Sequence, residues 1–315
     1  MEDTSGGSDT SAHQDTDTAQ PEDTGRDSGS DTQEPEDTGE PADTAMELAW
    51  IEVATGRIDS CAIQNDGEGA CWGKDEFYQA YLPEIHLVAI AMGDAHVCGL
   101  DQAGLAQCWG VRGGDQGFGQ VADAPAVGFT SLASGTHHNC GLTDQNNIHC
   151  WGKNESGQAT PPDLRFQQVS AGAAHTCGLT ESQAIECWGD NANQRSDAPT
   201  GMFDAFDVGR EHACAIHAGS QEVECWGNNP AGQTDVPENT SGVQVAAGGE
   251  HSCVLTGTGE VICWGSNADG QTDVPTATFT QIDAGWRHSC GITTDASLLC
   301  WGYDKYDQAQ PPSLP

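Results

Sequence analysis

The sequence predicts an all-β fold, a seven-bladed β-propeller, and three observations support that fold class. The tripeptide Cys-Trp-Gly occurs seven times, at intervals of 37 to 42 residues. A second cysteine precedes each copy by ten or eleven positions, so seven pairs use all 14 cysteines. Short apolar stretches and polar turns fill the units without helical periodicity. Repeats of about 40 residues with three or four short strands are typical of propellers.

Residues 1–45 differ in composition from the remainder and are predicted to be a disordered acidic tether, with the propeller over residues 46–315. The tether holds 14 of the 48 acidic residues and the pair Asp-Thr eight times, among Ser, Gly and Pro. Such a segment has too little apolar surface to offset the entropy of ordering, and its like charges favour an extended chain. It resembles the spacers that follow the lipid-modified cysteine of bacterial surface lipoproteins.

The chain has no apolar run long enough to span a membrane, and no signal peptide precedes the acidic segment. The protein is then either cytosolic or a mature form whose start has been trimmed. We expect the second case, an extracellular or cell-surface protein. Its membrane attachment would depend on a lipid anchor lost from the N-terminus.

The formal charge of -38 limits the classes of partner. Residues 46–315 hold 34 acidic and nine basic residues, a net charge of -25. Nucleic-acid binding needs a basic face that displaces counterions from phosphates, so we expect no nucleic-acid partner. We also expect no cofactor, and a monomer.

In each unit the two cysteines are spaced to face each other across a β-hairpin. Pairing Cys177 with Cys187 leaves a three-residue loop whose third position favours Gly or Asn, and four units carry one there. Facing Cα atoms at a non-hydrogen-bonded position are about 4.5 Å apart, which a disulfide tolerates. The spacing predicts seven disulfides: Cys61–Cys71, Cys98–Cys108, Cys140–Cys150, Cys177–Cys187, Cys214–Cys225, Cys253–Cys263 and Cys290–Cys300.

Two other states of the cysteines stay open on the sequence alone. They could be seven pairs of reduced, buried thiols, or they could bind zinc. Zinc ribbons and fingers usually use Cys-x-x-Cys knuckles, which this chain lacks, so we predict no metal site. Seven equivalent thiols would also make no sense as one catalytic centre.

A histidine stands two positions before the first cysteine in six units, and Asp59 takes its place in the remaining one. In the predicted register His138 faces Gly152, which leaves room for the imidazole ring. We therefore interpret these histidines as structural, each fixed by a hydrogen bond to the backbone, and not as a metal or proton site.

The unit Phe-x-x-Val-x-Ala-Gly-x-x-His-x-Cys-Gly-Leu-Thr, followed by Cys-Trp-Gly-x-Asn-x-x-Gly-Gln, resembles the regulator-of-chromosome-condensation repeat in its short, cysteine-paired variety. The resemblance covers residues 46–315 and implies a seven-bladed propeller. Members of that family include a nuclear exchange factor, ectodomains of crinkly-type plant receptor kinases and a secreted bacterial inhibitor of β-lactamases. This chain departs from the pattern at Asp59, at Gly242 in place of a bulky apolar residue, and in a longer turn over 111–120.

The two residues inside each Gly-x-x-His run vary most between units and are expected at one level of the ring. Three of the nine basic residues of 46–315 fall there, together with a tryptophan. Arg beside aromatic residues is a common interface composition, so we predict a binding surface for a protein or glycan. The alternative is ordinary loop residues. The candidate binding residues are Arg57, Arg210, Glu211, Trp286, Arg287, Arg112 and Phe118.

Three further hypotheses concern function. The protein could be a hydrolase or lyase with His137, Glu211 or Glu250 as acid or base at the channel mouth, but the sequence has no nucleophile elbow or metal-ligand motif. We therefore predict a binding protein, not an enzyme, and no catalytic residue. Inhibition of a secreted enzyme is a special case of binding. The turn Ser266 to Asp273 faintly resembles a calcium-binding EF-hand loop but lacks the terminal Glu, which favours an ordinary turn.

Overall fold

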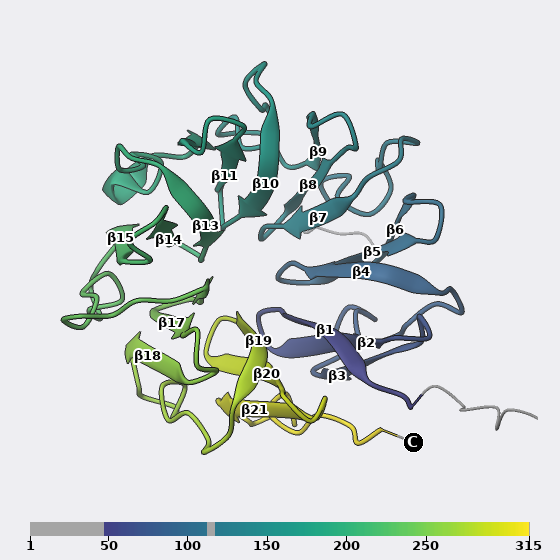
Figure 1. The fold of residues 1–315 in the computed structure, drawn as a ribbon. Coiled ribbons are helices and arrows are strands. Elements are labelled where there is room, and N and C mark those ends of the chain that lie inside the picture. The colour runs from purple at the N-terminus through teal and green to yellow at the C-terminus, as the bar shows by residue number, and fades with distance from the viewer. Residues whose placement is uncertain (1–46, 112–116, 315) are drawn as a thin grey trace, which may run out of the picture. The chain divides into compact units, whose positions relative to one another are not determined.

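The computed structural model describes residues 47–111 and 117–314, so the predicted tether lies outside the described residues. Seven three-stranded antiparallel sheets stand around a central axis, which confirms the predicted propeller (Figure 1). Within the described ranges no helix combines the length and the apolar composition needed to cross a membrane. The elements are β1 (Trp50–Thr55), β2 (Asp59–Gln64), β3 (Gly69–Gly73), β4 (Leu87–Met92), β5 (His96–Asp101), β6 (Ala106–Gly110), β7 (Ser131–Ser134), β8 (His138–Leu142), β9 (Ile148–Gly152), β10 (Phe166–Ala171), β11 (His175–Thr180), β12 (Ile185–Gly189), η1 (Ala192–Gln194), β13 (Phe203–Val208), β14 (His212–His217), β15 (Val223–Gly227), β16 (Gln244–Ala247), β17 (His251–Leu255), β18 (Val261–Gly265), β19 (Phe279–Ala284), β20 (His288–Thr293) and β21 (Leu298–Gly302).

The second and third strands of every sheet form the predicted hairpin. In β11 and β12, Cys177 lies opposite Cys187 and His175 opposite Gly189. All 14 cysteines are in disulfides, with Cα atoms 4.0 to 4.1 Å apart, so the predicted pairs are confirmed and free thiols are excluded. The hairpin loop absorbs the extra residue of the fifth unit, because Cys214 still faces Cys225.

Neighbouring sheets pack face to face through apolar side chains. Leu142 and Ile148 of the third sheet share a buried cluster with Phe166 and Val169 of the fourth. The Phe166 ring occupies the space above Gly178, where an added Cβ would lie 2.4 Å from the Phe166 Cδ1 atom. The glycine after the first cysteine therefore makes room for the bulky residue that begins the first strand.

This packing explains why Gly242 departs from the pattern. In the sixth unit the positions are reversed, with Gly242 in place of the bulky residue and Val254 in place of the glycine. A Cβ added to Gly242 would lie 2.1 Å from Cγ2 of Val254, so the valine fills the space that a phenylalanine fills elsewhere. Both arrangements close the same gap between sheets.

An indole hydrogen bond joins each sheet to the one before it, and at most joins a histidine adds a second polar contact. Nε2 of His138 lies 2.8 Å from the Thr176 hydroxyl, which donates to the Gln158 carbonyl at 2.9 Å. The Trp188 indole N–H donates to the same carbonyl at 2.9 Å. The histidine ring thus bonds to a side chain of the next sheet, and its Nδ1 has no hydrogen-bond partner among the described residues, so the predicted hydrogen bond to the backbone was wrong for His138.

The last and first sheets are joined in the same way. His288 Nε2 lies 2.8 Å from the Ser60 hydroxyl, and the Trp72 indole donates to the Gln308 carbonyl at 2.9 Å. The turn after β21 therefore accepts an indole hydrogen bond from the first sheet, just as the turn after β9 accepts one from the fourth sheet.

This second polar contact is missing where the next sheet offers no polar partner. The next sheet has Ala213 at the position that would meet His175, and neither ring nitrogen of His175 has a hydrogen-bond partner in the described part of the chain. Val97 holds the same position after Asp59, which is fully buried, and that burial raises the pKa of the Asp59 carboxyl to about 8. Burial lowers the pKa of His175 to about 3, so this histidine is neutral near pH 7.

Gly242 and Val254 fill one gap together. Changing either residue alone should therefore lower the free energy of unfolding more than changing both. Val254→Gly is expected to lower the free energy of unfolding by about 2 to 4 kcal/mol through loss of a buried side chain. Gly242→Phe should be destabilising because its ring meets Val254. The double variant restores the arrangement of Phe166 and Gly178, so the losses should couple by about 1 kcal/mol or more in its favour. Denaturant unfolding of the oxidised proteins measures this cycle, and simple additivity would contradict it.

Asp59→Asn should change how stability depends on pH. The carboxyl is protonated in the folded protein up to about pH 8 but ionised above about pH 4 when unfolded, so folding takes up a proton between those values. The stability contributed by the neutral carboxyl is therefore complete below about pH 4 and lost as pH rises toward about 8. The amide of the variant has no proton to bind, so the variant should gain stability relative to the native protein between about pH 5 and pH 8. Asp163→Asn, at an exposed position, is the control, and equal pH dependence of the native protein and Asp59→Asn would overturn the account.

Candidate functional site

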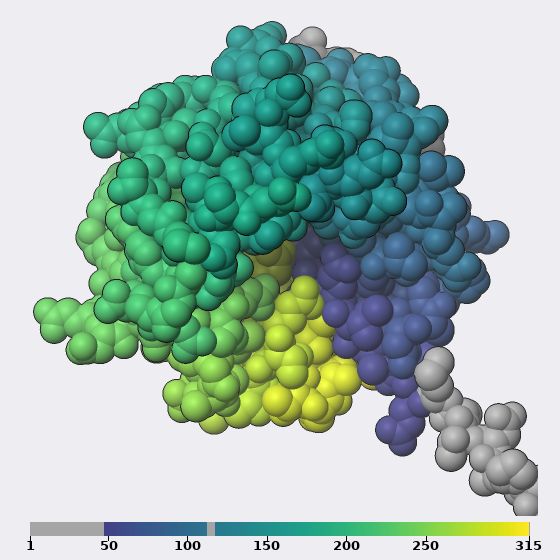
Figure 2. Space-filling view, turned by 45° about the horizontal axis from the view of Figure 1, so that its top comes forward, coloured from purple at the N-terminus to yellow at the C-terminus, as the bar shows by residue number. Residues whose placement is uncertain are grey.

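A channel runs between the seven first strands, with a cavity of about 300 Å³. Figure 2 shows the hollow at the centre of the ring. The strands β1, β4, β7, β10, β13, β16 and β19 provide its wall. Each of these strands leads into the Gly-x-x-His turn, or Gly-x-x-Asp after β1, so the variable residues of the turns surround one mouth of the channel.

Side chains bridge neighbouring first strands along the wall. Gln244 donates to the Ile282 carbonyl at 2.8 Å and accepts from the Ile282 N–H at 3.1 Å. Gln281 accepts from the Val53 N–H at 3.2 Å, and Glu52 accepts from the Ile90 N–H at 3.2 Å. These bonds supply the wall with the backbone partners that a shared sheet would otherwise give.

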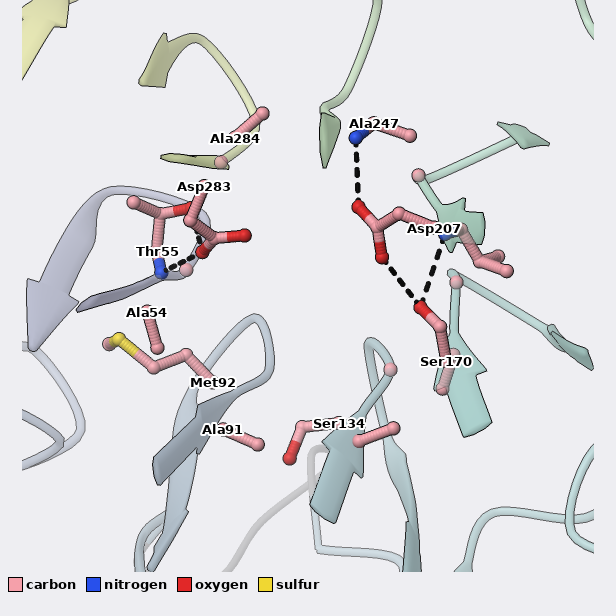
Figure 3. Close-up of a pocket in the computed structure, with 18 of the residues that line it drawn as sticks. Ala54, Thr55, Ala91, Met92, Ser134, Ser170, Asp207, Ala247, Asp283 and Ala284 are labelled. Carbon is pink, nitrogen blue, oxygen red and sulfur yellow. Dashed lines mark hydrogen bonds between the residues drawn. The ribbon is translucent and has the colours of Figure 1, made fainter. Parts of the chain in front are cut away.

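Two partly buried carboxylates, Asp207 and Asp283, face the channel from opposite sides (Figure 3). Asp283 accepts from the Thr55 N–H at 2.6 Å and the Thr55 hydroxyl at 2.7 Å, and Asp207 accepts from the Ser170 hydroxyl at 2.8 Å. Burial raises the pKa of Asp283 to about 7, and the charge of Asp207 adds to that rise. Burial is also the main cause that raises the pKa of Asp207. Their hydrogen bonds tie adjacent sheets together, which is a structural role.

Three of the predicted binding residues meet at the mouth. The guanidinium carbon of Arg57 lies 4.4 Å from the centre of the Trp286 ring, and that of Arg210 lies 4.6 Å from it. They come from the first, fifth and seventh sheets. The indole lies against Gly249, where an added Cβ would be 2.1 Å from the Trp286 Cδ1 atom. Glycine at this variable position is therefore what lets the indole reach across the sixth sheet.

The acidic residue of this cluster is Asp94. Burial raises its carboxyl pKa, and the charges of Arg57, Arg210 and His137 oppose that rise. Thr136 donates a long hydrogen bond of 3.4 Å to it. The mouth thus combines two cations and an indole with one half-buried acid.

The other predicted binding residues make contacts outside the Trp286 cluster. Glu211 accepts from the Asn228 side chain at 2.7 Å, and Arg287 pairs with Asp269 beside the mouth. Phe118 contacts the His137 ring edge-on, with centroids 5.0 Å apart, and Lys153 lies over the Phe118 ring. Arg112 lies outside the described residues. The structure therefore groups Arg57, Arg210 and Trp286, with Arg287 next to them.

A second hollow of about 450 Å³ adjoins the mouth and includes residues that the sequence analysis missed. Arg57 and Trp286 line both hollows, and Lys74, Tyr303 and Tyr306 line only the second. We refer to this second hollow as the Tyr303–Tyr306 groove.

A signal for these missed residues is present in the sequence. Lys74 and Tyr303 directly follow Cys-Trp-Gly, a position that also varies between units. In all seven units the N–H at this position donates to the carbonyl of the second variable residue, as Tyr303 does to Arg287 at 2.9 Å. A comparison of the units at this position would have found Lys74 and Tyr303, but not Tyr306, which lies three positions further along the chain.

Within the described ranges, no arrangement of side chains specifically supports the catalytic or the calcium hypothesis. Glu211 is held by Asn228, and no cluster of three metal-ligating side chains occurs among the described residues. In the turn Ser266 to Asp273, Asn267 donates to Asp273 at 2.8 Å and accepts from the Thr272 N–H at 3.1 Å. The same turn bonds recur at Asn229, so they belong to the repeat.

Comparison with known structures supports the fold. The ectodomain of the Physcomitrella patens receptor kinase CR4 is 27% identical over 85% of this chain and 76% of that chain, with a TM-score of 0.67. The CRINKLY WD40 ectodomain of Arabidopsis thaliana ACR4 is 23% identical, over 85% of this chain and 99% of that one, with a TM-score of 0.68. Prp20p of Saccharomyces cerevisiae is 16% identical, over 73% and 75%, with a TM-score of 0.62. The last two comparisons show the fold alone. Among curated proteins, none matches the sequence.

The repeats themselves match a family model. The regulator of chromosome condensation (RCC1) repeat matches residues 129–158, 166–195, 243–271 and 279–308. These are the third, fourth, sixth and seventh units, and the other three share their cysteines and strand register. Four of the seven sheets therefore match the regulator of chromosome condensation repeat, and the chain as a whole is a seven-bladed propeller with that strand pattern.

Proposed function

We propose that this protein is an extracytoplasmic interaction propeller, held at the cell surface by its acidic N-terminal segment, that binds a protein or glycan partner at the channel mouth. The observation that carries the proposal is the grouping of Arg57 and Arg210 around Trp286. Tryptophan and arginine are the residues most often found at the energetic centres of interfaces. In this chain they occupy positions that the fold leaves free to vary.

Two features support the location. Seven disulfides form and persist in an oxidising compartment and are rare in the cytosol. A similar chain, that of CR4, is a receptor ectodomain. Inhibition of a secreted enzyme would be one form of such binding.

A photoreactive residue at Glu250 should cross-link the partner on the surface of the native host. Glu250 is exposed and lines the Tyr303–Tyr306 groove, so its replacement leaves Arg57, Arg210 and Trp286 in place. The matched control is Leu164, which is exposed at the far end of β10 from the channel mouth. Adducts from Glu250 that disappear with Trp286→Ala are the expected result, because losing a central tryptophan costs about 2 kcal/mol or more, which weakens binding more than tenfold. Adducts formed equally from Leu164 would place the contact elsewhere.

A further inference from the structure

Cations gather on one face of an otherwise acidic body. Residues 46–315 contain nine basic residues and carry a net charge of -25. Five of the nine lie over three aromatic rings at the mouth and its groove. Arg57 and Arg210 lie over Trp286, Lys74 and Lys305 over Tyr306, and Arg287 over Tyr303. This face is where the protein's field is least repulsive to an anion.

Three of these cations lack a carboxylate partner. Lys74 pairs with Glu76 and Arg287 with Asp269, whereas Arg57, Arg210 and Lys305 make no ion pair at 4.0 Å or less within residues 47–111 and 117–314. Arg57 and Arg210 are nevertheless held over the same indole, and both are exposed. Two like charges kept this close repel each other, and a bound anion would relieve that repulsion.

The acids on this face do not replace such an anion. Asp94 is half-buried and accepts from the Thr136 hydroxyl. Burial raises its pKa against the charges of Arg57 and Arg210, but it forms no ion pair with either of them within residues 47–111 and 117–314. Glu76 is already paired with Lys74, and Glu250 lines the groove without an ion pair among the described residues. Arg57 and Arg210 are therefore exposed, and neither is in an ion pair with a carboxylate of the described residues.

The chemistry of the rings favours a peptide over a sugar. A pyranose ring binds by packing its C–H groups on an open aromatic face, and here cations lie over the rings of Trp286, Tyr303 and Tyr306. Covered rings hold their cations in place, which lowers the entropy lost when a guanidinium group binds a carboxylate. Arginine matches carboxylate geometry with two parallel hydrogen bonds.

We propose that the channel mouth and the Tyr303–Tyr306 groove bind an acidic segment of a partner protein, with its carboxylates on Arg57 and Arg210. The proposal rests on the proposed function and names the class of partner for that site. The net charge of the body makes the site selective, because an acidic segment is repelled from most of the remaining surface.

The test uses a fluorescent hexaglutamate peptide and the full oxidised chain, with binding followed by polarisation at low salt. We expect binding that weakens as NaCl rises, since added ions screen the charges. Arg57→Gln with Arg210→Gln should reduce affinity at least tenfold, while Arg57→Lys with Arg210→Lys should keep part of it. Arg165→Gln, at a basic residue outside this face, is the matched control and should bind as the native protein does. Thermal unfolding confirms that each variant is folded.

Other results of this test distinguish a failure of the acidic-segment proposal from a failure of the proposed interaction function. Equal binding by the native protein and the double glutamine variant, or no binding of hexaglutamate, would overturn the proposal. Binding of oligogalacturonate at this face in place of hexaglutamate would overturn it in favour of a glycan. If Glu250 still cross-links a partner in those cases, the interaction function stands and only the acidic-segment assignment fails.

Discussion

One backbone oxygen in each unit holds the ring together. In the described residues neighbouring sheets share no strand ladder, so each join depends on single hydrogen bonds and packed side chains. The Gln158 carbonyl accepts from the Trp188 indole and the Thr176 hydroxyl, and that hydroxyl meets His138 of the sheet before. The residues that recur in every unit are thus largely the residues that assemble neighbouring sheets. The side chains at the two variable positions of each inner turn are free of this role, although the turn backbone is part of it.

That freedom explains where the candidate site lies. Trp286 reaches the two arginines because Gly249 leaves space, and neither arginine contributes to the core. The same repeat that fixes the backbone of seven turns at one level also places side chains from distant parts of the sequence next to one another. A ring can therefore change its binding chemistry at the mouth without changing the contacts between its sheets.

The sequence alone predicted what depends on contacts within one unit. The hairpin register follows from the spacing of Cys177 and Cys187, since both ends of the constraint lie in one short segment. Contacts between units were harder to predict from the sequence, because they depend on how far each sheet is shifted against the next. For that reason the hydroxyl partner of His138 and the exchange of Gly242 with Val254 were not foreseen. The sequence also predicted that the variable turn residues lie at one level, and the structure brings Arg57, Arg210 and Trp286 together there. Their contact was not predicted, because it depends on how far each side chain reaches across the mouth.

The disulfides also affect what a protease can do to this protein. Each one closes a hairpin loop within a single sheet, such as the loop between Cys61 and Cys71. A peptide bond cut inside one of those loops leaves both fragments covalently joined and still paired in the same sheet. Exposed hairpin tips, such as the one at Asp66 and Glu68, are open to cleavage, and a cut there would leave the sheet joined by its disulfide.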